Sequence, residues 1–349
     1  MRRQTIVFAV IVFFAGLNAF SYQAPNHFLS GNAGLMGTGL RQSCYALDVA
    51  ADVLPCNPAF IAKEKERHFN ANLSLGNNVS YLKEATDLSQ GHANEDSIKK
   101  LFTQHEDNEL QTQMELGHIQ ETFGWSVTPA LVNYSTSFHN QALPKISLYA
   151  SLEEVAKLQF GSYWSDDWSY GIQLRYVHRR FVASQFYLTD ALVQDGHYLF
   201  EPRQQYLFFV EPGVMFAPKD SPLNPEFTLM VGNSGFVNER FAEVPVEPEY
   251  HFTSSINPEL DYGRFSLGVD VNFNRKLREG PGPLTLGGFY EFGILRLFGS
   301  LARDENGIGF GIFNTWWNMG VTHRNESFQN PLDETITISK TYFFLGIEI

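Results

Sequence analysis

Residues 31–62 read GNAGLMGTGLRQSCYALDVAADVLPCNPAFIA, and the interpretation of the whole chain depends on this stretch. Its first part contains glycines that permit positive φ and close backbone approach, namely Gly31, Gly34, Gly37 and Gly39. Its last part, Asn57-Pro58-Ala59, predicts a turn, because an Asn side chain bonds local backbone and proline fixes φ. Asp48 and Asp52 lie between them on one side of a helical turn. The pattern suits neither a strand nor a long helix and predicts a plug.

This order of features resembles the N-terminal signature of the long-chain fatty-acid transporter (FadL-like) family of bacterial outer-membrane barrels, and of a related barrel that shuttles cargo in a Bacteroidetes-type secretion system. Residues 284–312, LTLGGFYEFGILRLFGSLARDENGIGFGI, are similar to hairpins of the same superfamily, although Gly288-Phe289-Tyr290-Glu291 permutes the usual order. The resemblance implies a barrel of about fourteen strands whose lumen holds an N-terminal hatch. It places the Asn57-Pro58-Ala59 element in that hatch and implies transport of a fatty-acid-like molecule.

The first 21 residues have the three parts of a secretory signal peptide. Arg2 and Arg3 precede the apolar run 6–14, and Ala19-Phe20-Ser21 supplies small residues for cleavage, which we expect after Ser21. No cysteine follows closely enough to carry a lipid. The alternative, an N-terminal membrane anchor, is shorter than the roughly 20 residues that a spanning helix needs.

Alternation of apolar and polar residues predicts strands throughout the rest of the chain. After the turn Ser165-Asp166-Asp167, one face carries Trp168, Tyr170, Ile172, Leu174 and Tyr176, and the other carries Ser169, Gly171, Gln173, Arg175 and Arg179. In a membrane barrel apolar residues that face lipid alternate with polar residues that face the lumen, so the mean hydropathy stays low. The mean hydropathy of -0.20 and the 15% aromatic residues of this chain are consistent with that pattern. A soluble sandwich with one buried face alternates equally well.

Three features favour the membrane barrel over the sandwich. The signal peptide exports the chain, and the strands have about the ten residues needed to cross a bilayer at a tilt. The last strand puts Thr341, Phe343, Leu345, Ile347 and Ile349 on one face, and this resembles the C-terminal signal read by the barrel-insertion machinery, with Ile349 in place of the usual aromatic residue. We therefore expect a bacterial outer-membrane protein in contact with lipid.

The predicted fold class is all-β, a transmembrane antiparallel up-and-down β-barrel of 12–14 strands with the N-terminal hatch inside the lumen. Residues 1–21 form the signal peptide, 22–66 the hatch and 67–349 the barrel. The expected strands are 67–83, 112–124, 126–138, 145–152, 155–164, 168–180, 205–216, 225–233, 249–256, 263–273, 284–292, 294–302, 308–323 and 335–349. A polar insert at 84–112 has a plausible helix start at Asn94-Glu95-Asp96, and it forms either a lid over the barrel mouth or a solvated loop.

Cys44 and Cys56 are the only cysteines, and both lie in the hatch. In an exported protein such a pair predicts a disulfide, which would stabilise a short loop by roughly 3 kcal/mol in the chain-entropy model. Two free buried thiols are the alternative.

Motifs for catalysis or for cofactor binding are scarce. The glycines at 34, 37 and 39 do not open a helix of a βαβ unit, Asp304-Glu305-Asn306-Gly307 predicts a hairpin turn, and the ten His are scattered without metal-ligand spacing. The net charge of -13 disfavours nucleic acid as a partner. We expect no enzyme activity, no cofactor and no metal.

The leading hypothesis is a hydrophobic small-molecule channel gated by the hatch, with Asn57, Pro58, Ala59, Asp48 and Asp52 as gate residues. The alternative is a non-transporting binding, shuttle or structural barrel. A continuous apolar cavity that touches Asn57 would favour transport, and polar packing around it would favour a structural or docking role.

Overall fold

The computed structural model describes residues 35–48, 53–65, 67–77, 81–91, 108–139, 145–187, 200–219, 221–273, 284–303, 305–329 and 335–349. The predicted signal peptide, Gly31, Gly34, Asp52 and the helix start at 94–96 lie outside these residues.

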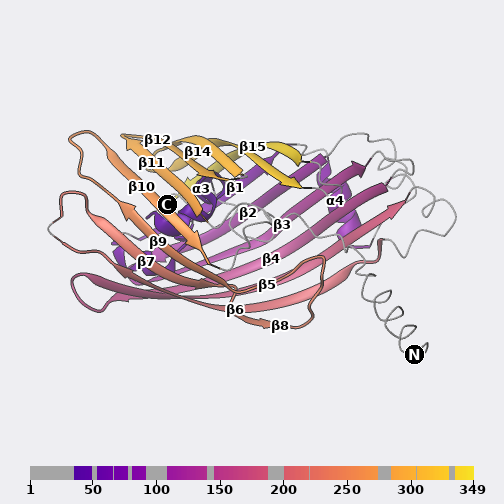
Figure 1. The fold of residues 1–349 in the computed structure, drawn as a ribbon, viewed down its shortest axis with the longest axis horizontal. Coiled ribbons are helices and arrows are strands. Elements are labelled where there is room, and N and C mark those ends of the chain that lie inside the picture. The colour runs from indigo at the N-terminus through magenta and orange to yellow at the C-terminus, as the bar shows by residue number, and fades with distance from the viewer. Residues whose placement is uncertain are drawn as a thin grey trace, which may run out of the picture.

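The strands form one closed antiparallel ring in which sequence neighbours are spatial neighbours (Figure 1). The ring contains β1 (His68–Gly76), β2 (Asn108–Gln120), β3 (Phe123–His139), β4 (Lys145–Tyr163), β5 (Trp168–Tyr187), β6 (Arg203–Phe216), β7 (Pro225–Gly232), β9 (Glu249–Ile256), β10 (Arg264–Asn272), β11 (Leu284–Phe292), β12 (Leu295–Ala302), β13 (Glu305–Phe313), β14 (Trp317–Gln329) and β15 (Thr335–Glu348). β1 pairs with β15 and closes it. The short β8 (Gly235–Val237) continues β7 beyond Asn233, whose φ is 52°, and pairs with β6. The fold is thus the predicted all-β barrel, with fourteen strands.

The prediction divided one strand into two and joined two strands into one, and these two errors left the number of strands unchanged. Residues 145–152 and 155–164 form the single strand β4, because Glu153 points inward to Arg179 and Glu154 points outward to Arg180, so neither interrupts the alternation. The single strand expected at 308–323 is instead β13 and β14, which are joined by a tight turn in which the Asn314 amide donates to the Trp317 carbonyl.

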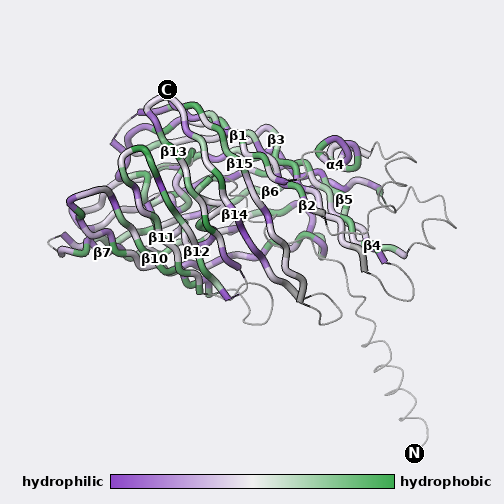
Figure 2. Tube along the Cα trace, turned by 90° about the horizontal axis from the view of Figure 1, so that it is seen from above, coloured by the Kyte–Doolittle hydropathy of each residue, from purple (hydrophilic) through white to green (hydrophobic). Residues whose placement is uncertain are grey.

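The outward side chains of the barrel are mostly apolar, whereas many of its inward side chains are polar. On β5, Trp168, Tyr170 and Tyr176 are exposed on the outside, whereas inward Gln173 and Arg175 are buried. The same alternation runs along the other strands (Figure 2), and outward Leu297 is 57% and Phe343 is 55% exposed. Such a broad exposed apolar belt is unfavourable in water, so the barrel spans a membrane and the sandwich is excluded.

The connections differ at the two ends of the barrel. Short connections such as 120–123 and 163–168 mark what we call the turn end, where the Phe69 amide also donates to the Ile349 carbonyl at 2.8 Å. Longer connections, including 76–108, 187–203 and 237–249, mark the loop end. Among the described residues, no helix is long and apolar enough to cross a bilayer.

One helix of the insert, α4 (Leu82–Ser89), covers the outside of the wall at the loop end. The predicted strand 67–83 ends at Gly76, and the chain then reaches α4 before β2. Ala85 and Leu88 pack on Tyr134 and Val182, which alternate with lumen-facing residues and so point outward. The described helix of the insert therefore shields an apolar wall, and it does not cover the mouth.

Candidate functional site: the hatch and its seat

The N-terminal segment lies inside the barrel as three short helices, α3 (Leu35–Leu40), η1 (Arg41–Ala46) and η2 (Pro58–Lys63). We call residues 35–48 and 53–63 the hatch. In Figure 1 its indigo helices lie within the ring of strands. Its side chains form a shared core with inward side chains of the barrel, which contains Leu35, Met36, Leu40 and Leu47 with Phe289, Phe298, Tyr342 and Phe344. The hatch is thus packed against the wall and is part of the folded core.

The Asn57-Pro58-Ala59 turn joins the hatch to the barrel through one side chain. Asn57 caps η2: its Oδ1 accepts from the Ala59 amide at 3.0 Å, the local bond expected from the sequence. Its Nδ2 donates to Thr228 Oγ1 on β7 at 2.9 Å, and Ser169 on β5 donates to the Ala59 carbonyl at 3.2 Å. Asn57 is completely buried. The turn is therefore fixed on both of its sides.

Inward glycines on four consecutive strands form the seat of residues 53–63, the half of the hatch that contains this turn: Gly124, Gly161, Gly171 and Gly213. A methyl group at Gly171 would lie 2.7 Å from the Ala59 nitrogen, and one at Gly161 would lie 2.7 Å from Ile61 Cγ2. Both separations are shorter than the roughly 3.5 Å at which nonbonded heavy atoms rest in contact. The strands lack side chains here because the hatch backbone occupies that space.

A second set of glycines seats the other half of the hatch. A methyl group at Gly268 would lie 2.8 Å from Ala46 Cβ, and one at Gly287 would lie 2.6 Å from Ser43 Cβ. Ser300 on β12 also donates to the Gly39 carbonyl at 2.7 Å. Many of the inward glycines in the strands thus mark hatch contacts, a pattern that was not recognised in the sequence.

Ion pairs fasten both halves of the hatch. Lys63 pairs with Glu226 on β7, while Asp48 accepts from Arg264 on β10 at 3.1 Å and lies 3.8 Å from Lys63. Asp48 therefore bridges the hatch and the wall. At the other end Arg41 pairs with Glu305 on β13. Its φ of 54° is rare for a residue with a side chain, and the surrounding contacts maintain it.

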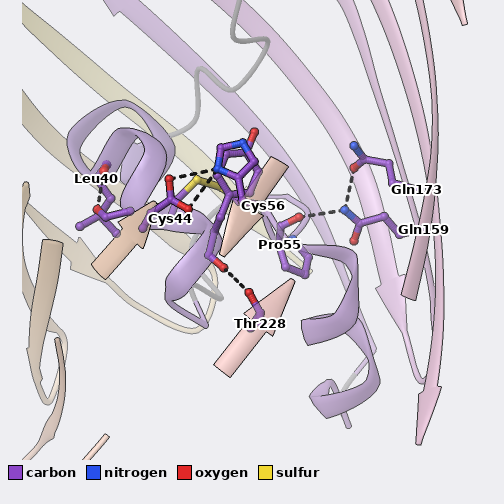
Figure 3. The surroundings of a disulfide bond; sticks show 11 residues. Leu40, Cys44, Pro55, Cys56, Gln159, Gln173 and Thr228 are labelled. Carbon is purple, nitrogen blue, oxygen red and sulfur yellow. Dashed lines mark hydrogen bonds and ion pairs between the residues drawn. A yellow bond between two sulfur atoms is a disulfide. The ribbon is translucent and has the colours of Figure 1, made fainter. Parts of the chain in front are cut away.

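A disulfide between Cys44 and Cys56 links the two halves, with Cα atoms 5.8 Å apart. It confirms the predicted bridge and excludes the free thiols. Figure 3 shows the bridge beside a hydrogen-bonded row in which Gln159 donates to the Pro55 carbonyl at 2.8 Å and to Gln173 at 2.7 Å. The surroundings of the Asn57 turn are thus polar and closely packed.

A buried histidine touches the hatch and was missed from the sequence. His251 on β9 is fully buried, with Nδ1 3.0 Å from Asp270 and Nε2 3.1 Å from Glu249. The ring of the hatch residue Tyr45 lies 4.2 Å from the His251 ring. The available signal was the strand alternation, which places both His251 and Asp270 on the inward face. Among the described residues no group of three or more His, Cys, Asp or Glu is arranged to hold a metal ion.

Buried ion pairs within the wall form a polar layer above the hatch. On β5, Arg175 pairs with Glu211 of β6 at 2.7 Å, and Arg179 pairs with Glu153 of β4 at 2.9 Å. Each charge is thus compensated by a barrel residue, as burial requires.

Toward the loop end the inner wall becomes apolar and is covered by residues 238–248, which we call the lid. Inward Val155, Val177, Leu207 and Phe209 pack with Val246, and inward Tyr149 and Phe181 pack with Val244 and Phe241. Gln205 on β6 donates to the Glu239 carbonyl at 2.9 Å. A connection expected to be a loop thus folds into the lumen and buries the apolar inner surface.

Solved structures share this fold, although no known family profile matches the sequence and no curated protein matches it. The deltaS2S3 and deltaS2 mutants of the TodX monoaromatic hydrocarbon channel have TM-scores of 0.51 and 0.50, identities of 9% and 10%, and coverage of 91% and 92% of this chain and 98% of each channel. A Pseudomonas aeruginosa FadL homologue has a TM-score of 0.47 at 8% identity over 94% of this chain and 99% of that one. The similarity to the TodX structures confirms the expected barrel at the level of the fold.

Proposed function

We propose that this chain is an outer-membrane channel for a hydrophobic small molecule and that the hatch is its gate. The observation that carries the proposal is the combination of a closed barrel, a hatch seated on glycines at the turn end and an apolar inner surface toward the loop end. An open pore would need no hatch, and an apolar inner wall offers the kind of surface on which a hydrophobic ligand packs.

The gate in this proposal is the Asn57-Pro58-Ala59 turn together with Asp48. All four residues belong to the hatch, and the turn contacts strands β5, β6 and β7. A shift of the turn would break few hydrogen bonds and no strand pairing, so it would open a path along the wall while the barrel stays intact. Asp52 is proposed as a gate residue from the sequence alone.

The fold relatives support a hydrophobic cargo. The TodX proteins are described as monoaromatic hydrocarbon channels, and the sequence resemblance implies a fatty-acid-like molecule. Outer-membrane lipids would surround the aromatic belt, and the insertion machinery would recognise β15 during assembly. The arrangement calls for no cofactor and no catalytic residue.

One observation favours the second candidate, a non-transporting shuttle or structural barrel. The surroundings of Asn57 are polar, and ion pairs and a disulfide restrain the hatch. A hatch that never moves would suit a barrel that only binds a partner.

Uptake measurements separate the two candidates. Gram-negative cells that lack a barrel of this fold would express the chain, and uptake of radiolabelled toluene and oleate would be compared with cells that express an unrelated outer-membrane barrel to the same level. Faster uptake of either probe is expected. Uptake equal to that of the unrelated barrel, with the chain correctly inserted, would refute the transport function.

A further inference from the structure

We infer that the lid competes with the ligand for one binding site. The ligand of this site is a hydrophobic carboxylate that carries an aromatic ring. This inference rests on the proposed transport function and narrows its substrate class.

The site is organised around Arg203, the first residue of β6. Its guanidinium carbon lies 5.4 Å from the centre of the Phe181 ring on β5 and 5.3 Å from the centre of the Phe241 ring on the lid. Nη2 donates to the Ala183 carbonyl at 3.0 Å, and Nη1 donates to the carboxylate of Glu243 at 3.0 Å. An arginine that lies between two aromatic rings and binds a carboxylate can recognise a ligand that has both an anionic group and an aromatic ring.

Arg203 differs from the other inward arginines of β5 and β6. Arg175 and Arg179 pair with Glu211 and Glu153, which belong to the barrel wall. The carboxylate that compensates Arg203 comes from the lid. If the lid moves, Arg203 loses its carboxylate partner and exposes its guanidinium beside the apolar inner wall, so the open site can accept an anion from elsewhere.

The lid supplies three chemical groups within four residues. Phe241 gives a ring against Arg203, Glu243 gives the carboxylate, and Val244 is fully buried against Tyr149 and Phe181. One small molecule with a ring, an apolar chain and a carboxylate would satisfy the same three contacts. A neutral hydrocarbon would fill the apolar part only and leave the guanidinium uncompensated, so it would displace the lid poorly.

The geometry also leaves the site reachable from water at the loop end. The side chains of Arg203 and Glu243 are 34% and 22% exposed, so their ion pair is partly screened and is weaker than a buried one. A lid held by such a pair and by a few apolar contacts can exchange with a ligand.

Calorimetry on the full-length protein in detergent tests the inference with 4-phenylbutyrate and its neutral counterpart, 4-phenylbutan-1-ol. The parent protein should bind the acid more tightly than the alcohol. Glu243→Gln should bind the acid roughly three- to fivefold more tightly, because the competing carboxylate is gone from a partly exposed pair. Arg203→Gln should lose the preference for the acid over the alcohol.

Glu154→Gln and Arg180→Gln are the matched controls. These residues form an ion pair at 3.3 Å in the same region of β4 and β5, but on the outer face. Neither variant should change the affinity for the acid. A gel shift on boiling would verify that each variant has folded.

Equal affinities for acid and alcohol in the parent would overturn the inference, as would an unchanged or weaker affinity of Glu243→Gln for the acid. If toluene or oleate is taken up but the parent protein does not bind the acid more tightly than the alcohol, the carboxylate site is refuted and the transport function is retained. Binding with the expected variant pattern, but without uptake of any probe, would retain the site and refute transport.

Discussion

Replacing Gly171 by alanine tests whether the hatch depends on its glycine seat. Gly171 lies at an inward position of β5, opposite the Asn57-Pro58-Ala59 turn, and its backbone tolerates a side chain because its φ is not positive. The added methyl group would therefore collide with the hatch and would leave the strand undisturbed. Alanine also has no strand-breaking effect, so the ladders to β4 and β6 should persist.

The size of the collision follows from the structure. The methyl carbon would overlap the Pro58 carbonyl group and would lie 2.7 Å from the Ala59 nitrogen, whereas nonbonded heavy atoms in contact rest at about 3.5 Å, so the turn must move by at least about 0.8 Å. Such overpacking costs about 1–3 kcal/mol. The Asn57–Thr228 bond at 2.9 Å and the Ser169–Ala59 bond at 3.2 Å join the moving turn to fixed strands, and both would lengthen.

Hydrogen exchange and conductance measure the result. The amides of Phe60 and Ala59 should exchange at least tenfold faster in Gly171→Ala, since a loss of about 1.4 kcal/mol corresponds to a factor of ten. Conductance in a planar bilayer or uptake of toluene should change as well.

Gly232→Ala is the matched control, because Gly232 also points into the lumen but its added methyl group would meet only the Glu249 side chain, at 3.6 Å or more, which is ordinary contact. If both variants show parental exchange at Ala59 and Phe60, the glycine seat does not hold the hatch. If exchange increases in Gly171→Ala but uptake and conductance stay unchanged, the seat is real and the hatch is not a gate.

Three further predictions concern the hatch, its bridge and the barrel. Pro58→Gly should insert normally yet alter uptake of a long-chain hydrophobic probe or raise conductance, because it frees φ at the turn; parental values in both assays would contradict the gate. Because Cys44 and Cys56 form a disulfide, the denatured and unreduced protein should take up no thiol reagent, whereas labelling of both cysteines would exclude the bridge. The protein should fractionate with outer membranes and migrate faster on a gel before boiling than after, and recovery as a heat-insensitive periplasmic protein would refute the barrel in that membrane.

The sequence predicted the local contacts of the hatch turn but not its contacts with the barrel wall. Asn57 and Pro58 were identified from local chemistry, because a capping bond to Ala59 and a fixed φ depend on neighbouring residues only. The partner of the second Asn57 bond, Thr228, lies 171 residues away, and the seat glycines come from four strands. These contacts were not predictable, because a polar side chain inside a barrel has several equivalent inward partners and the sequence does not specify which strands meet.

The sequence by itself determined the barrel, its inward and outward faces and the disulfide. Apolar and polar residues alternate with a period of two, so the sequence of each strand shows which residues face lipid. The two cysteines of the exported segment can form only one intramolecular disulfide, which is with each other. Only the tertiary structure decided that α4 covers the outer wall, that residues 238–248 fold into the lumen, and that Arg203 meets Glu243 there. These contacts join residues far apart in the sequence, and the connecting segment 238–248 has no periodic apolar pattern that would predict the burial of Val244.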